Sequence, residues 1–256
     1  MKFGLCSDIR SLKQFDNTVI DYCEMALSGI YGLSDNEINE ILEISKKTGI
    51  KTTHTNGFFP GDIKLCGNEF DEERIKSYAE VALEKANTLG VKTLVLGSGA
   101  ARKIPEGVEY SHAVEQFMAG AKIAADICAG YGMTIVIEPL YTPETNMINT
   151  VKEGGDVVRR INHPNVKLLC DIFHYAYEKE DVDVLYENKD ILKHFHIANP
   201  NGRVYPSEND EFDYKRVAKA MKDIGYDLSI SIEGRAINNF DEDLPKSIAY
   251  LKKIFA

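Results

Sequence analysis

The stretch Thr134-Ile135-Val136-Ile137-Glu138-Pro139 places a carboxylate and a proline directly after a short apolar, β-branched run. A continuous apolar run of this kind is typical of a strand that is buried on both faces, as in a parallel sheet. A charged residue at the last position of such a strand has left the core and faces whatever lies above the sheet. The stretch therefore predicts a buried parallel strand that presents Glu138 at its carboxyl end.

The same design recurs three times downstream. Lys167–Asp171 ends in an aspartate, Lys193–Ile197 carries His196 near its end, and Leu228–Gly234 carries Glu233. An acid just after a strand can simply cap a helix, but four successive strand ends with three carboxylates and one imidazole would be an unusual coincidence. Such ligands suit Mn²⁺, Mg²⁺, Co²⁺ or Zn²⁺, and the absence of cysteine at these positions argues against a structural zinc site. We interpret the four strand ends as one site for a divalent metal.

The rest of the chain alternates predicted strands and helices over its 256 residues. The other predicted strands are Lys2–Cys6, Asp21–Ala26, Ile50–His54 and Val91–Leu96. The predicted helices are Asp35–Lys47, Asp71–Leu89, Glu109–Tyr131, Thr150–Ile161, Asp181–Glu187, Asp213–Ile224 and Asp243–Phe255. Strict alternation implies a parallel sheet with right-handed crossovers, and no linker or low-complexity segment marks a boundary. The sequence therefore predicts a single (β/α)8 TIM barrel that spans residues 1–256 as one domain.

Composition and charge narrow the class of protein. A hydrophobic share of 44% and a charged share of 27% are ordinary for a globular chain with a sizeable core. The formal net charge of −10 leaves no basic surface for a polyanion, which argues against nucleic acid as a partner. No signal-peptide pattern opens the chain, no apolar run approaches the ~18 residues of a membrane span, and the five cysteines are scattered. We expect a cytoplasmic protein with no membrane or nucleic-acid partner, and leave open whether it forms a homo-oligomer.

Further residues are candidates because barrels of this kind carry their reactive groups at the carboxyl-terminal mouth. His54 ends a predicted strand just before the long loop Thr55–Phe70, so we predict that it lines the mouth and contacts the substrate. His194 is interpreted as an interior histidine one layer deeper. Glu24 lies inside a predicted strand, where it is either a pocket residue or a paired carboxylate. Gly97-Ser98-Gly99 is equally compatible with a phosphate cradle and with a turn at the rim.

Four motifs carry a resemblance to a known family. They are Glu138-Pro139, Asp171-Ile172-Phe173-His174, His194-Phe195-His196-Ile197 and Ile230-Ser231-Ile232-Glu233-Gly234. The chain resembles the xylose isomerase-like sugar isomerase/epimerase superfamily over nearly its whole length, and within it the branch of ketose 3-epimerases and hydroxypyruvate isomerases. The resemblance implies one bound divalent metal, Mn²⁺ first among the candidates, with the ligands Glu138, Asp171, His196 and Glu233.

The resemblance also implies a class of substrate and the residues that contact it. The substrate is a small sugar or a sugar-derived ketone. Contacts are implied at Glu144, six residues after the first ligand, at His174, three residues after Asp171, and at Arg203, shortly after the metal-binding histidine. Neither the identity of the sugar nor its phosphorylation follows from the sequence.

The chemistry of such a site can be argued physically. A proton on a carbon beside a ketone is too weakly acidic for a carboxylate unless the developing enediolate charge is stabilised, which a metal chelated by the substrate can do. Epimerisation also needs a base on each face of the planar intermediate. We predict that Glu138 and Glu233, on opposite sides of the metal, are this catalytic pair. For aldose–ketose isomerisation, one carboxylate could instead move the proton between adjacent carbons.

Three alternatives remain beside a metal-dependent isomerase or epimerase. A dehydratase or lyase acting on a keto-inositol or a 3-keto glycoside would use the same metal and bases. A metal-dependent apurinic endonuclease would share the barrel but needs more histidines and a basic face, whereas this chain has six histidines and a net charge of −10. A non-catalytic sugar-binding relative would more naturally have lost a ligand or a base, and this chain keeps the whole set.

Overall fold

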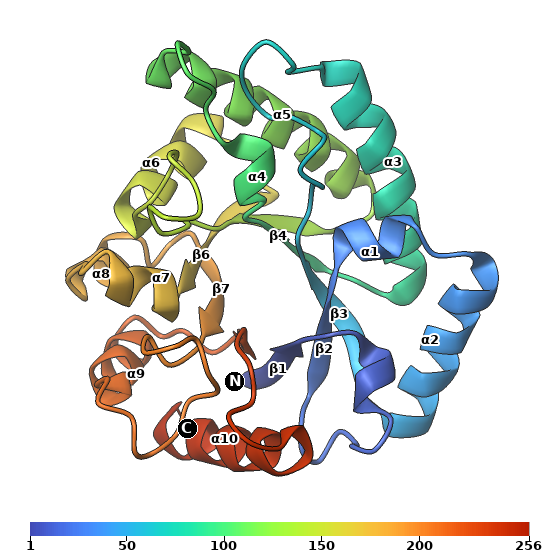
Figure 1. The fold of residues 1–256 in the computed structure, drawn as a ribbon, viewed down its shortest axis with the longest axis vertical. Coiled ribbons are helices and arrows are strands. Elements are labelled where there is room, and N and C mark those ends of the chain that lie inside the picture. Colours follow the sequence, from blue (N-terminus) through green and yellow to red (C-terminus); the bar gives the residue numbers. More distant parts are fainter. Residues whose placement is uncertain (256) are drawn as a thin grey trace.

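The computed structural model describes residues 1–255, whose strands close into one parallel barrel (Figure 1). The strands follow one another around the ring in chain order, and the pairing of β1 with both β2 and β8 completes the closure. Their bounds are β1 Lys2–Cys6, β2 Tyr22–Ala26, β3 Lys51–Asn56, β4 Thr93–Leu96, β5 Thr134–Ile137, β6 Val166–Asp171, β7 Leu192–Ile197 and β8 Ser229–Ile232. The predicted (β/α)8 TIM barrel is therefore confirmed.

The long helices lie outside the barrel, where their apolar stripes cover the strands (Figure 1). They are α2 Asp35–Thr48, α3 Glu72–Leu89, α5 Tyr110–Gly130, α6 Val151–Ile161, α9 Tyr214–Asp223 and α10 Phe240–Phe255, with the shorter α8 Asp183–Glu187. Capping boxes begin two of them, at Ser34 with Glu37 and at Thr150 with Glu153. None of the helices within residues 1–255 combines the length and apolar character needed to span a bilayer.

Short helices that the sequence analysis missed lie in the loops after the carboxyl ends of strands. They are the 3-10 helix η1 Ile9–Leu12, α1 Leu27–Tyr31, α4 Gly99–Arg102 and α7 Ile172–Tyr177. Helices of four to six residues are too short to show the periodic apolar pattern that reveals a longer helix. All of them follow a strand end, so they belong to the mouth of the barrel.

The barrel interior is divided into an apolar half and a polar half. Val95, Val136 and Leu169, from β4, β5 and β6, form a small buried apolar cluster of their own. Buried polar side chains come from the other side of the ring: Tyr22, Glu24, His54, His194, His196, Ser229 and Ser231. Gly4 on β1 makes room for one of them, because a Cβ there would lie 2.2 Å from a ring atom of Tyr22. The polar half leads from the floor of the barrel to its mouth.

Candidate active site

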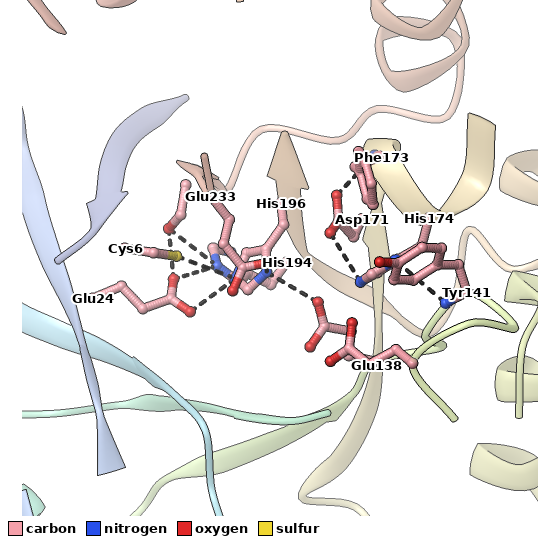
Figure 2. A network of polar contacts seen from close by, with 12 residues as sticks. Cys6, Glu24, Glu138, Tyr141, Asp171, Phe173, His174, His194, His196 and Glu233 are labelled. Atoms are coloured by element: carbon pink, nitrogen blue, oxygen red, sulfur yellow. Dashed lines mark hydrogen bonds and ion pairs between the residues drawn. The ribbon is translucent and has the colours of Figure 1, made fainter. Parts of the chain in front are cut away.

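Four side chains converge at the mouth, as the strand order requires (Figure 2). Glu138 follows β5 directly, Asp171 is the last residue of β6, His196 lies near the end of β7, and Glu233 follows β8. One donor atom from each residue can be chosen so that all four lie within 4.8 Å of one another. His196 Nδ1 lies 3.1 Å from Glu138 Oε1 and 3.3 Å from Glu233 Oε2. The structure thus brings together every residue that the sequence analysis assigned to the metal.

The three carboxylates of this cluster are held at an electrostatic cost. Burial, and then the charge of Glu233, raise the pKa of Glu138 and raise the pKa of Asp171 to about 6. Burial opposes the ionisation of Glu233 as well, but His196 and Arg203 lower its pKa to about 2. The buried carboxylates of Glu138 and Asp171 and the partly exposed one of Glu233, within reach of a single imidazole, are a donor set that a divalent cation would neutralise. The residues present therefore fit a metal ion with oxygen and nitrogen ligands.

Arg203 closes the cluster on the mouth side. Its Nη2 donates to Glu233 Oε2 and, at 3.3 Å, to Asp171 Oδ2. Its guanidinium carbon lies 4.7 Å from the centre of the Phe173 ring, and Nη1 is 3.9 Å from Glu144 Oε2. Arg203 and Glu144 are both partly exposed, so they lie where a ligand would enter. Two of the predicted substrate contacts are therefore at the rim of the site.

His174 presents an unpartnered polar atom to the same site. Its Nδ1 accepts a hydrogen bond from the backbone N–H of Tyr141 at 3.3 Å, and the two rings stack with centroids 5.0 Å apart. Since Nδ1 accepts and burial lowers the pKa of this imidazole, the ring proton belongs on Nε2. Nε2 lies 3.3 Å from Asp171 Oδ2 without the geometry of a hydrogen bond, and no described residue satisfies it. This N–H is available to a ligand.

His54 lies elsewhere, and its predicted place at the mouth is wrong. β3 continues to Asn56, and His54 is level with Thr93, the first residue of β4. Its Nε2 is 3.0 Å from Ser229 Oγ, and its ring stacks on Tyr22 at 4.2 Å. It lines a cavity at the amino-terminal floor of the barrel. The predicted strand ends two residues before β3 does, and His54 does not belong among the substrate contacts.

The sequence left two interpretations of Glu24 open, a pocket residue or a paired carboxylate. In the structure it is a paired carboxylate. It is fully buried on β2, and its two oxygens lie 2.8 Å from His196 Nε2 and 2.9 Å from His194 Nε2 (Figure 2). Burial opposes its ionisation, yet the two histidines hold the pKa of Glu24 well below its usual range. Burial lowers the pKa of His194 and lowers that of His54 to about 3, so both imidazoles are neutral at pH 7.

Gly97 and Ser98 follow β4 at the rim of the barrel, and Gly97 lies against the carboxylate of Glu138. Ser98 has φ 48°, in the left-handed region, and leads into α4. A Cβ at Gly97 would lie 2.2 Å from Glu138 Oε2, so only glycine leaves space for that carboxylate. The close approach to Glu138 thus explains the glycine at position 97 of the motif Gly97-Ser98-Gly99.

A parallel eight-stranded barrel with carboxylates and histidine gathered at the ends of β5 to β8 defines a class of barrel protein with a metal-type site at its mouth. Residues 18–254 match the family described as "Xylose isomerase-like TIM barrel", and the chain belongs to this family.

Proteins similar to this chain include isomerases and epimerases. The chain is 28% identical over 222 residues to D-psicose 3-epimerase of Agrobacterium fabrum, which covers 83% of the chain and 74% of that protein. It is 26% identical over 210 residues to a putative hydroxypyruvate isomerase of Drosophila melanogaster, covering 78% and 77%. Among solved structures, 3-keto-D-glucoside 4-epimerase from E. coli superimposes with a TM-score of 0.84 at 21% identity, over 99% of each chain.

Proposed function

We propose that this protein is a divalent metal-dependent sugar epimerase or isomerase that moves a proton on the carbon beside a ketone. The observation that carries the proposal is the convergence of Glu138 and Glu233, with Asp171 and His196, at one mouth of the barrel. The activities of its relatives support it. Inverting carbon 3 of a 2-ketose and shifting a carbonyl to the neighbouring carbon both begin by removing a proton next to a carbonyl group.

The metal would be held by Glu138, Asp171, His196 and Glu233, and Mn²⁺ is our first candidate. When bound, it supplies a Lewis acid that stabilises the negative charge developing on the carbonyl oxygen of the substrate. Asp171 also accepts the backbone N–H of Phe173 at 2.8 Å and so caps α7, which fixes its carboxylate at the end of β6. This positioning is built into the fold and does not depend on the ligand.

Glu138 and Glu233 are the proposed acid and base. They follow β5 and β8, which stand at the two ends of the arc of four strands that carries the site. A substrate between them would meet one carboxylate on each face, as epimerisation requires: one removes the proton and the other returns one. His174 would donate its free Nε2–H to a substrate oxygen, while Arg203 and Glu144 at the rim would contact substrate hydroxyl groups.

Hydrogen exchange with solvent tests this proposal. The metal-loaded protein is incubated in D₂O with D-psicose, D-fructose and a 3-keto glycoside, and products are followed by NMR. We expect deuterium at the carbon beside the carbonyl, in step with formation of the epimer or isomer. Glu138→Gln and Glu233→Gln should each lower the rate by a factor on the order of 100 or more, because an amide cannot transfer the proton.

A matched variant controls for the loss of a carboxylate as such. Glu153→Gln changes a capping residue of α6 outside the site, and its exchange rate should equal that of the wild type. Full activity of both site variants with metal bound would contradict the proposed roles. Epimer formation without deuterium incorporation would contradict proton transfer with solvent-exchangeable carboxylates.

A further inference from the structure

A row of hydrogen-bonded side chains runs through the polar half of the barrel, from its floor to the cluster at the mouth. It is built from β3, β8, β7 and β2, and it ends at the Nε2 atom of His196. We call it the interior row; its members are Thr53, His54, Ser229, His194 and Glu24. The proposed reaction does not use any of these residues directly, although most of them are buried.

Glu24 determines the direction of every hydrogen bond in the interior row, because an ionised carboxylate can only accept. His194 Nε2, at 2.9 Å, must therefore donate to Glu24 Oε2. With its Nε2 proton directed at Glu24, His194 then accepts at Nδ1 from Ser229 Oγ, at 2.9 Å. With its proton so used, Ser229 Oγ accepts from His54 Nε2 at 3.0 Å, and His54 Nδ1 accepts from Thr53 Oγ1 at 2.9 Å. One arrangement of protons satisfies the whole row.

Neighbouring side chains hold Glu24 in place from the side. Ser231 Oγ donates to Glu24 Oε2 at 2.6 Å, and the hydroxyl group of Tyr22 lies 2.8 Å from Ser231 Oγ. Since Ser231 gives its proton to Glu24, Tyr22 is the donor in the second contact. Glu24 Oε2 is thus fully used by two donors, which leaves Oε1 for His196 alone.

The position of Glu24 determines which nitrogen of His196 carries its proton. Glu24 Oε1 accepts from His196 Nε2 at 2.8 Å, so the proton of a neutral His196 ring belongs on Nε2. The opposite nitrogen, Nδ1, faces the carboxylates of Glu138 and Glu233, at 3.1 and 3.3 Å, and is the nitrogen that would exchange its proton for a metal ion (Figure 2). This is the arrangement in which an imidazole can bind a metal through Nδ1, with its other nitrogen fixed by a carboxylate.

We infer that Glu24 is the positioning residue of the metal site, and that the interior row fixes Glu24 so that His196 offers Nδ1 to the metal. The inference rests on the metal site proposed above and adds a residue that touches neither the metal nor the substrate. It gives the polar half of the barrel a function, because each of its hydrogen bonds depends on the acceptor at Glu24.

Glu24→Gln tests the inference, since it keeps the size of the side chain and adds a donor. The amide oxygen must face His196 to accept its Nε2–H, so the amide NH₂ faces His194 Nε2. His194 must then accept at Nε2 and carry its proton on Nδ1, which can donate to the Ser229 carbonyl at 3.2 Å. We expect the proton of His194 to move from Nε2 to Nδ1, and metal affinity to fall by about 10- to 100-fold.

Two measurements follow these effects without using turnover. The dissociation constants of Zn²⁺ and Mn²⁺ are measured by competition with a chromophoric chelator. The tautomers of His194 and His196 are read from ¹⁵N NMR of the Zn²⁺-loaded protein with labelled histidine, of which the chain has six. Glu24→Asp keeps a group that can only accept, so His194 should remain protonated on Nε2 in that variant. It also provides a second variant should Glu24→Gln fail to fold.

Glu180→Gln is the matched control. Glu180 is a partly buried carboxylate away from the site that accepts the backbone N–H of Val151 at 2.8 Å. Its variant should keep the wild-type metal affinity and tautomers. Wild-type metal affinity in Glu24→Gln, or an Nε2-protonated His194 in that variant, would overturn the inference and leave the proposed function standing. A wild-type protein that binds no divalent metal would overturn both.

Discussion

Gly97 and Glu138 are so close that the carboxylate fits only because Gly97 carries a hydrogen atom in place of a side chain. Gly97 follows β4, and the space of its missing side chain is taken by the carboxylate of Glu138 on the neighbouring strand end. A methyl group there would meet Glu138 Oε2 at 2.2 Å. The position of the proposed base is therefore sensitive to a residue that has no side chain of its own.

We expect Gly97→Ala to displace the Glu138 carboxylate and to lower turnover on the order of 100-fold, because a shift of about 1 Å in a reacting group has this effect. Metal affinity should fall as well, while the circular dichroism spectrum stays that of the wild type. Gly130→Ala is the control, since a Cβ at Gly130 meets nothing within 4 Å at the end of α5. Equal turnover in the two variants would show that Glu138 is not constrained from β4.

A substitution at His174 should affect substrate binding without affecting metal binding. Its free Nε2–H faces the cluster, but the ring is outside the set of converging donors. We expect His174→Ala to leave metal content unchanged while kcat/KM falls by about 10-fold or more, the loss of a hydrogen bond of about 1.5 kcal/mol or more. Metal analysis and kinetics on the same sample measure both. Loss of metal from this variant would assign His174 to the ligands instead.

At the scale of elements, α4 ties the mouth loops together through Arg102. This side chain is fully buried, and no carboxylate among the described residues pairs with it. Its Nη1 donates to the backbone carbonyl of Glu138 at 2.9 Å and its Nη2 to that of Ile148 at 3.3 Å. The loop between these two carbonyls carries Glu144. Burial lowers the pKa of Arg102 to about 10, so the guanidinium is still charged at pH 7.

Arg102→Met should therefore destabilise the protein by about 1 to 3 kcal/mol, because the Glu138 carbonyl loses its donor while a similar apolar volume is kept. We also expect a raised KM for the substrate, since the loop with Glu144 loses its clamp. Chemical denaturation and steady-state kinetics measure the two effects. Lys103→Met, at the exposed neighbouring position, should change neither; an equal effect of both variants would point to a general loss of charge.

The elements that the sequence predicted are those long enough to leave a pattern. The helices α2, α3 and α5 show apolar stripes over many turns, and the site strands end abruptly in charged residues, so both could be found. α4 and α7 could not, since four to six residues contain little more than one turn. Glu24 was visible only as a charge inside a strand, because its partner His196 is far away in sequence and only barrel closure brings them together.

At the scale of the whole molecule, the metal site joins four consecutive strands, so it forms only when β5 to β8 are paired in the folded barrel. A ligand that binds only the folded state stabilises it by mass action. We expect Mn²⁺ at 100 times its dissociation constant to raise the free energy of unfolding by about 2.7 kcal/mol, and EDTA to reverse the effect.

Thermal unfolding with and without metal measures this stabilisation. Asp171→Asn retains an oxygen that can cap α7 but removes a charge from the site, so its unfolding temperature should respond much less to Mn²⁺. An equal shift in the variant and the wild type would place the metal elsewhere in the molecule.

The interior row has an electrical consequence for the barrel. With the proton order that we infer, every O–H and N–H group from Thr53 to His194 donates to the next member of the row, and the last one donates to Glu24. The donor at the end of the row, His194 Nε2–H, faces a carboxylate that is 0% exposed. Oriented dipoles can therefore stabilise the negative charge of Glu24 in the core without a lysine or arginine beside it. The charge of Glu24 can in this way be kept in the barrel interior, next to the histidine on which the proposed metal site depends.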